Sequence, residues 1–199
     1  VPREHRLVER ASGLVTIAGG KLTTYRVMAA QTVDVVARRL RALDGRPLPR
    51  RAATDREPLP GGEVRDLDAL TEELAKEGLS AEVARHLVVS YGTEARAIAN
   101  LMAADRSLAG PLVPDGPWRL AEVVYQARRE MALTVSDVLI RRTHAFHLRA
   151  DQALSAAPVV AQLLASELEW DADRRAASVA AYVADVERMR QAFRPRDSA

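Results

Sequence analysis

The stretch TIAGGKLTTYRVMA, residues 16–29, joins an apolar run to a segment with the spacing of a helix. The glycine pair 19–20 ends the apolar run, and glycine lets a backbone approach a ligand closely because it carries no side chain and reaches positive φ. Thr23 or Thr24 begins the following helix, whose free N–H groups and positive dipole end face the same place. Lys21 adds a full positive charge there. The stretch therefore predicts a strand–turn–helix junction suited to an anion or to a polar ring edge.

Two named phosphate-binding motifs do not fit this junction. A P-loop needs a glycine at position 15 and Ser or Thr at position 22, where the chain has Val15 and Leu22. The G-x-G-x-x-G spacing of dinucleotide-binding folds is absent from the sequence as well. On the residues alone, an ordinary glycine-containing turn with a solvated lysine remains an open alternative.

The chain around the junction divides by composition. Residues 7–9 and 14–18 predict two short strands, and residues 24–43 predict a helix. One face of that helix is expected to be apolar because hydrophobic side chains recur at three- and four-residue steps. These side chains are Val33, Val36, Leu40 and Leu43.

Residues 44–62, DGRPLPRRAATDREPLPGG, hold four prolines and three glycines and predict a linker or surface loop. Everything after the loop has helical spacing. The expected helices are 64–77, 81–89, 93–104, 118–132, 136–147, 155–168 and 172–193. In the helix over 118–132 the apolar stripe is Leu120, Val123, Val124, Ala127 and Met131, with Glu122, Gln126 and Arg129 elsewhere on the wheel. The expected fold is mainly α, with a short strand–turn–helix fragment before a helical domain.

The amino-acid composition excludes several classes of function. The chain has 199 residues, is 48% hydrophobic, and has a formal net charge of +2, so it can bury a substantial core and shows little bias toward nucleic acid. It has no cysteine, which excludes disulfides, thiolate chemistry and zinc fingers. No apolar segment approaches the roughly 18 residues that span a bilayer. We therefore expect a cytoplasmic protein, with peripheral attachment to the cytoplasmic membrane as the other option.

Three stretches carry a resemblance to a known family. These are PREH at 2–5, SGLVTIAGGKLTTYRVMA at 12–29 and EMALTVSDVLIRRT at 130–143. Together with the helical remainder, they resemble the C-terminal part of the FAD-dependent glycerol-3-phosphate dehydrogenases. The resemblance implies that residues 1–44 are the incomplete end of an FAD- and substrate-binding domain, residues 45–62 a linker, and residues 63–199 the helical C-terminal domain.

The resemblance also implies a reaction, a cofactor and site residues. In such enzymes sn-glycerol 3-phosphate is oxidised to dihydroxyacetone phosphate, and electrons pass through FAD to membrane quinone. Arg3 and Lys21 are the expected substrate-binding residues. The expected cofactor-binding residues are Gly19, Gly20, Lys21, Thr23 and Thr24.

One part of the family pattern is missing from this sequence. The Gly-rich fingerprint for the FAD pyrophosphate is absent, so the partner implied is an N-terminal FAD-binding domain supplied from elsewhere. We expect the chain to be a truncated product, an isolated domain or one half of a split enzyme, and to be inactive without that partner. A noncatalytic helical module that docks on a separate flavoprotein or a membrane surface is the main alternative.

Two further patterns point elsewhere. His144 and His147 with Asp151 have a conceivable metal-ligand spacing, but no other histidine or carboxylate lies close in sequence, so no metal site is expected. Residues 81–102 have the outline of a helix-turn-helix. There Glu94 would face phosphate repulsion, so nucleic acid is not expected as a partner.

Overall fold

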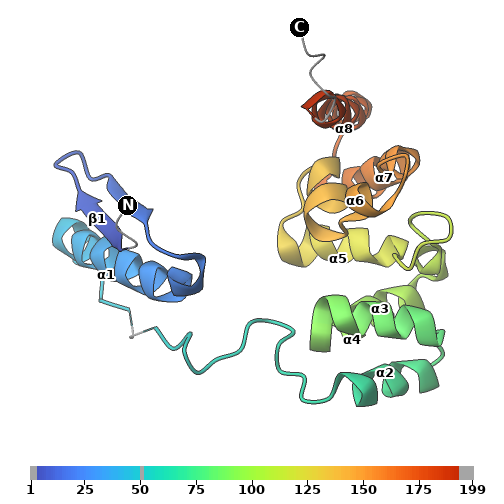
Figure 1. The fold of residues 1–199 in the computed structure, drawn as a ribbon, viewed down its shortest axis with the longest axis horizontal. Helices are drawn as coiled ribbons and strands as arrows, with labels where there is room; N and C mark the ends of the chain where they lie inside the picture. Colours follow the sequence, from blue (N-terminus) through green and yellow to red (C-terminus); the bar gives the residue numbers. More distant parts are fainter. Residues whose placement is uncertain (1–3, 50–51, 193–199) are drawn as a thin grey trace, which may run out of the picture. The chain divides into compact units, whose positions relative to one another are not determined.

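A computed structural model describes residues 4–49 and 52–192 of the chain. The chain forms two compact units, Val1–Leu59 and Pro60–Ala199, and each is described by itself (Figure 1). The first unit is a strand–turn–helix fragment, and the second is built of helices. This arrangement confirms the mainly α fold and the short β fragment that the sequence predicts.

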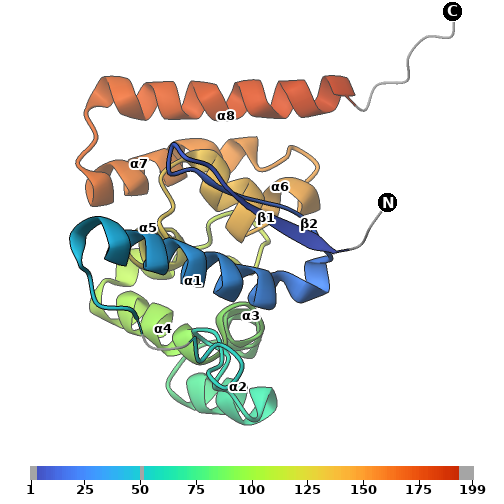
Figure 2. The same ribbon diagram turned by 90° about the vertical axis from the view of Figure 1, so that its left-hand side faces the viewer.

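In the first unit an antiparallel hairpin lies alongside one long helix (Figure 2). Strand β1 spans His5–Glu9 and β2 spans Val15–Gly19, paired from His5 opposite Gly19 to Glu9 opposite Val15. A 3₁₀ turn over Leu22–Thr24 leads into α1, Tyr25–Asp44. The helix ends at Gly45, whose φ of 74° is left-handed and favours glycine.

The residues expected on the apolar face of α1 are mostly exposed in this unit. Val33 is 57% exposed and Leu43 is 80% exposed, whereas Leu40 is half-buried. Met28, Thr32 and Arg39 of α1 are half-buried as well, and of the described residues of this unit only Val35 is buried. The helix therefore has one face on the hairpin and an adjacent apolar face that the unit itself leaves uncovered.

The second unit contains seven α-helices and several shorter helical turns within its described residues. The α-helices are α2 (Leu67–Lys76), α3 (Ala81–Tyr91), α4 (Ala95–Ala104), α5 (Leu120–Glu130), α6 (Ala145–Leu148), α7 (Ala157–Leu168) and α8 (Ala172–Ala192). Short 3₁₀ turns lie at Gly92–Glu94, Arg106–Ala109 and Leu154–Ala156, and a π-helix spans Asp137–Arg142. Side-chain caps begin two of the helices, since Asp66 accepts hydrogen bonds at the start of α2 and Ser80 does so at the start of α3.

Two apolar clusters form the core of this unit, and α5 contributes to both. Val123 of α5 lies in the cluster with α7 and α8. Ala121 and Tyr125 of the same helix lie in the cluster with α2, α3 and α4. A helix that is packed on two sides has almost no solvent face over its middle turns. The polar residues of α5 must therefore be paired inside the protein.

Several helix ends differ from the sequence prediction by a few residues, and two of the differences follow from a left-handed residue. The expected helix 136–147 is interrupted, because the Thr143 hydroxyl donates to the carbonyl of Val138 (2.8 Å) and His144 takes a φ of 55°. The expected helix 118–132 ends earlier, because Met131 adopts a left-handed conformation with a φ of 54°. Met131 is consequently 75% exposed rather than part of the apolar stripe.

A contact between two glycines fixes the start of the second unit. Gly61 and Gly92 both have positive φ, 86° and 56°, and a Cβ on Gly92 would overlap the carbonyl oxygen of Gly61. The Thr93 N–H donates to that same oxygen at 3.1 Å. The segment entering the helical unit is thereby held against the turn between α3 and α4.

Substituting Gly92 tests this contact. Gly92→Ala should lower the free energy of unfolding by about 3 kcal/mol or more, since the new methyl group collides with backbone and the residue also keeps an unfavourable φ. Gly78→Ala is the matched control, because Gly78 has a φ of 108° but open space around a Cβ. It should cost only about 1 to 2 kcal/mol. Equal losses for the two variants in urea denaturation would show that the glycine contact does not matter.

Candidate functional site

The glycine–lysine junction lies where β2 ends and the 3₁₀ turn begins. Gly19 has a φ of 79° and Gly20 a φ of 85°, so the backbone turns sharply through conformations that favour glycine. Lys21 follows in an extended conformation, and its side chain is exposed. Thr23 is exposed as well. The exposed lysine therefore stands at the beginning of the 3₁₀ turn that leads into α1, as the sequence indicates.

The threonine pair acts differently from the expected helix cap. The Thr24 hydroxyl donates to the carbonyl of Lys21 at 2.9 Å and lies 3.3 Å from the N–H of Lys21. It makes no side-chain hydrogen bond to the first N–H groups of α1. Thr24 thus closes the 3₁₀ turn on Lys21, and its side chain does not cap the N–H groups at the start of α1.

His5 is a residue of this junction that the sequence reasoning did not single out. It lies opposite Gly19 in the hairpin, and its Cβ would be 3.1 Å from a Cβ placed on Gly20. Its Nε2 is 2.5 Å from Oε1 of Gln31 on α1. The histidine thereby links the first strand to the helix beside the glycine turn. Arg3, expected to bind substrate, lies outside the described residues.

The segment 130–143 is held together by one arginine. Arg142 donates to the carbonyl of Glu130 at 2.5 Å and to the carbonyl of Asp137 at 3.2 Å. Arg141 pairs with the carboxylate of Asp137 at 2.9 Å. Both arginines therefore serve internal contacts that fold the turn after α5.

Asp137 is the acid at the centre of this turn. Burial tends to raise its pKa, but hydrogen bonds from Thr134 and from the N–H of Leu133, with the nearby guanidinium groups of Arg141 and Arg142, lower it below the usual range. The carboxylate is thus held in its charged form. It caps and pairs inside the turn, as expected for a structural acid rather than a catalytic base.

A buried carboxylate between α3 and α5 is the most enclosed charged group of the helical unit. The side chain of Glu122 is only 1% exposed. It accepts a hydrogen bond from the Tyr91 hydroxyl at 2.8 Å and from the N–H of Arg119 at 2.6 Å, and His86 Nε2 lies 3.0 Å away. Sequence reasoning placed Glu122 on the polar side of its helix. The structure corrects this, because α5 is covered on that side by α3.

Tyr91 extends the network to a second buried side chain of α5. The amide of Gln126, which is fully buried, donates to the Tyr91 hydroxyl at 2.8 Å. Burial, followed by the charge of Glu122, raises the pKa of Tyr91 well above its usual range. The neutral phenol that donates to Glu122 is therefore the form that the fold stabilises. Tyr91 lies 31 residues from Glu122 in the sequence, so no local pattern in a single chain indicates this contact.

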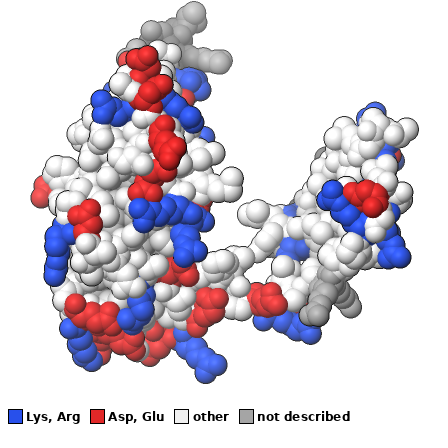
Figure 3. Space-filling view, turned by 180° about the vertical axis from the view of Figure 1, so that it is seen from behind, with Lys and Arg blue, Asp and Glu red and all other residues white. Residues whose placement is uncertain are grey.

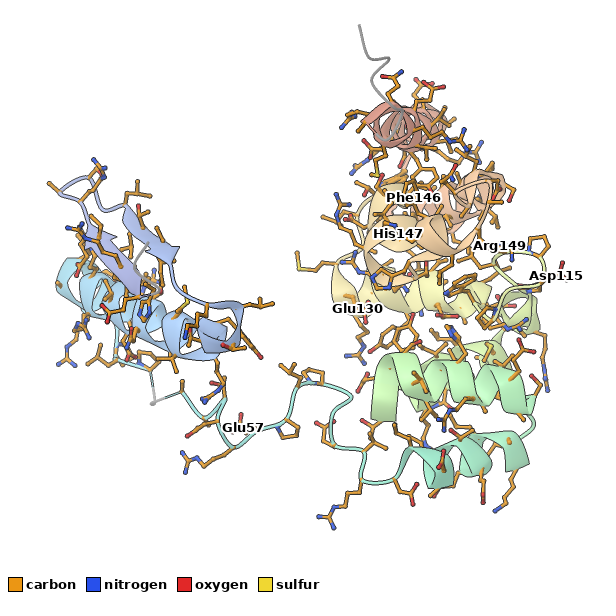
Figure 4. The ribbon with its side chains drawn as sticks, in the orientation of Figure 1. Glu57, Asp115, Glu130, Phe146, His147 and Arg149 are labelled. Atoms are coloured by element: carbon orange, nitrogen blue, oxygen red, sulfur yellow. The ribbon has the colours of Figure 1, made fainter. Side chains whose placement is uncertain are left out.

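The histidine group singled out in the sequence does not form a metal centre. His144 and His147 have ring centroids 6.4 Å apart, and His147 packs edge-on against Phe146 at 4.8 Å (Figure 4). Asp151 instead accepts from the N–H groups of Ala153 and Ser155. Within residues 4–49 and 52–192, no three His, Cys, Asp or Glu side chains are grouped so that they could hold a metal ion.

Charges are interspersed over much of the face in Figure 3, and acidic side chains gather at the α2 end of the helical unit. Arg96, which with Asn100 could read bases if the helix-turn-helix outline bound DNA, is held by carboxylates of this end. It donates to Glu77 at 2.6 Å and to Glu73 at 3.0 Å. Glu94 accepts from the Tyr125 hydroxyl. These side chains are thus engaged within the unit.

Comparison with known proteins identifies a family for this chain. Residues 52–175, more than half of the chain, match the family model described as the C-terminal domain of alpha-glycerophosphate oxidase. The chain belongs to this family. Its helical unit is therefore the glycerophosphate oxidase type of C-terminal domain, as the resemblance of residues 130–143 suggests.

Similar proteins are named glycerol-3-phosphate dehydrogenases. The chain is 37% identical over 176 residues to a probable mitochondrial glycerol-3-phosphate dehydrogenase of Dictyostelium discoideum, covering 88% of this chain and 27% of that protein. It is 34% identical over 189 residues to glycerol-3-phosphate dehydrogenase 2 of Mycobacterium tuberculosis H37Rv, covering 93% of this chain and 31% of that protein. The chain thus spans about a third or less of the length of these relatives.

A solved structure resembles the fold as well. The glycerol-3-phosphate dehydrogenase from Bacillus halodurans, complexed with FAD, matches with a TM-score of 0.70 and 28% identity, over 92% of this chain and 37% of that one. This chain of the glycerophosphate oxidase family has, among its described residues, no helix long and apolar enough to cross a membrane.

The buried carboxylate gives a stability prediction. Glu122→Ala should lower the free energy of unfolding by about 3 to 5 kcal/mol, because it leaves His86, Tyr91 and the Arg119 N–H without their buried partner. Glu122→Gln, which keeps one acceptor oxygen, should cost about 1 to 2 kcal/mol. The control Glu187→Ala changes an exposed glutamate of α8 and should alter stability by about 0.5 kcal/mol or less. Urea denaturation measures all three, and a Glu122→Ala variant as stable as the control would contradict the network's role.

Proposed function

We propose that this chain is part of an FAD-dependent glycerol-3-phosphate dehydrogenase in which the Gly19–Gly20–Lys21 junction borders the flavin and substrate. The observation that carries the proposal is the junction itself. A glycine pair with positive φ is followed by an exposed lysine where a 3₁₀ turn leads into a 20-residue helix, on a unit whose apolar faces are uncovered. Family membership adds the class of reaction.

The uncovered faces support a partner for the first unit. Leu22 is 89% exposed, Tyr25 59% and Val33 57%. Among the described residues of this unit only Val35 is buried, which is too little apolar burial to offset the conformational entropy lost on folding. We propose that the N-terminal FAD-binding domain of the enzyme covers these faces and continues the sheet.

The residues present fit one edge of a flavin. A Cβ on Gly19 would lie 2.8 Å from the carbonyl oxygen of Glu4, and a Cβ on Gly20 would lie 2.7 Å from Sδ of Met28. Positive φ and this close packing both favour glycine, and without side chains at these two positions the opposite side of the turn can come close to a polar ring edge. The described residues supply no pyrophosphate cradle, so the bulk of the cofactor would be held by the partner domain.

FAD, when bound, supplies the acceptor for the two electrons removed from the substrate carbinol. The contribution of this chain is electrostatic. Lys21, in front of the N–H groups of the turn and of α1, stabilises negative charge on the substrate phosphate or on the flavin edge. Thr23 and Thr24 belong to the same turn, in which Thr24 fixes the backbone of Lys21. Arg3 is proposed to bind the phosphate of glycerol 3-phosphate.

The finer features of the reaction are proposals too. We propose dihydroxyacetone phosphate as the product and the quinone pool as the electron acceptor, reached by peripheral attachment to the membrane. The names of the relatives support the substrate. We propose that the chain is inactive without the FAD-binding domain. The alternative, a noncatalytic module that docks on a separate flavoprotein, requires that Lys21 be dispensable.

Substituting the two lysines of the chain separates these possibilities. In the enzyme formed with an FAD-binding domain, fused or co-expressed, Lys21→Ala should reduce turnover about 100-fold, the scale for losing one charge-stabilising donor. Lys76→Ala is the matched control, because its amino group is 77% exposed and pairs only with Glu72 at 3.8 Å. It should leave turnover unchanged.

The assay follows oxidation of glycerol 3-phosphate with a quinone analogue, and the 199-residue chain alone serves as the blank. Wild-type turnover and KM in the Lys21→Ala enzyme would exclude the proposed role of the junction and favour a noncatalytic module.

A further inference from the structure

A hollow of about 530 Å³ in the helical unit lies far along the chain from the glycine–lysine junction. It is bounded by the turn between α2 and α3, by the second half of α4 and by the residues that follow α4. Among its lining residues are Leu79, Asn100, Met102, Arg106 and Arg119. Residues from four separate segments thus enclose one space.

Two arginines line this hollow without a partner inside the protein. Within residues 4–49 and 52–192, neither Arg106 nor Arg119 makes an ion pair or a side-chain hydrogen bond, and Nε of Arg119 is buried without an acceptor. A buried donor without an acceptor costs about 1 to 3 kcal/mol. An anion in the hollow would remove this cost.

The acid of the hollow cannot serve the two arginines. Glu77 also lines the space, but its carboxylate accepts from Arg96 at 2.6 Å. Its carboxylate is therefore engaged by an arginine that does not line the hollow and that also pairs with Glu73. The side chains left to act on a ligand carry two positive charges, next to the amide of Asn100.

One part of the wall is apolar, although Ser80 adds a hydroxyl to the lining. Val83 and Met102 are 8% and 4% exposed, and Leu79 packs against the same core cluster. Small side chains line the same space, namely Ala99, Ala103 and Ala109. These side chains offer apolar contact to a ligand that carries a short apolar group.

We propose that this hollow binds an organic phosphate monoester whose phosphate pairs with Arg106 and Arg119 and whose apolar group lies along Leu79 and Met102. A phosphate monoester carries about two negative charges at neutral pH, which matches the two guanidinium groups. The planar fork of arginine donates two parallel hydrogen bonds to phosphate oxygens. This site shares no residue with the proposed dehydrogenase site, so the phosphate-binding proposal does not depend on the proposed dehydrogenase function.

Binding of butyl phosphate to the full 199-residue chain tests the proposal. Isothermal titration should give binding for butyl phosphate, binding at least about tenfold weaker for inorganic phosphate, and none for butanol. Amide resonances of Leu79, Asn100 and Arg119 should shift during a nuclear magnetic resonance titration. Equal affinity for inorganic phosphate and butyl phosphate would overturn the apolar part of the site, and an absence of binding would overturn the whole.

Arginine variants locate the site. Arg106→Gln and Arg119→Gln should each weaken butyl phosphate binding at least about tenfold, since each removes charge-assisted hydrogen bonds. Arg129→Gln is the control, because Arg129 is an exposed arginine of α5 that lines a different hollow. Arg106 is exposed, so Arg106→Gln should fold normally. Its binding can therefore be measured even if Arg119→Gln unfolds. Unchanged binding in Arg106→Gln, or equal weakening in the control, would contradict the proposal.

Discussion

The helical unit depends on a charged carboxylate that is enclosed between two helices. Glu122 accepts the N–H of Arg119 at the start of its own helix and the hydroxyl of Tyr91 from α3, with His86 at hydrogen-bonding distance. This arrangement follows from the position of α5, which gives side chains to both apolar clusters and so has no exposed face over residues 121–126. A buried charge is tolerated only where hydrogen bonds replace its water, and the partners on α3 supply them. The same bonds fix α3 to α5, and Tyr91 immediately precedes the glycine contact that holds the entering segment.

The two units of the chain differ in how much of their apolar surface and how many of their polar groups they bury and pair internally. The helical unit buries two clusters and pairs its interior polar groups, apart from a few atoms such as Nε of Arg119. The hairpin and α1 bury a single residue among those described and expose most of their apolar side chains. Covering these exposed apolar side chains would stabilise the hairpin–helix unit, which is the role proposed for the FAD-binding domain. The residues proposed to act on substrate and flavin stand on this incomplete unit, which explains why they form only one side of a site.

Sequence patterns predict the helices and strands better than they predict the contacts between them. Period-two and period-3.6 spacing locate both strands, α1 and most helices of the second unit, because apolar residues must repeat on a packed face. The patterns fail where a single contact decides the backbone, as at Met131 and His144, whose positive φ values end or interrupt helices. They also misplace Glu122 and Gln126, since a helix covered on two sides buries polar positions that a wheel assigns to solvent. The glycine–lysine junction is recognisable in the sequence, because glycine indicates an unusual backbone conformation and lysine a positive charge. The contacts of His5 and Arg119 cannot be recognised in this way, because their neighbours are distant in sequence.

The contrast between a self-sufficient helical unit and an incomplete hairpin–helix unit can be measured residue by residue. Native-state hydrogen exchange on the full chain should show the amides of Leu87, Val88, Val123 and Tyr125 opening only with global unfolding, because they lie in the two buried clusters and beside the Glu122 network. The amides of α1, including Val33 and Val36, should exchange through local opening at a free energy of about 1 to 2 kcal/mol. Protection in α1 equal to that in α5 would contradict this account, because the hairpin–helix unit would then be stable without a partner.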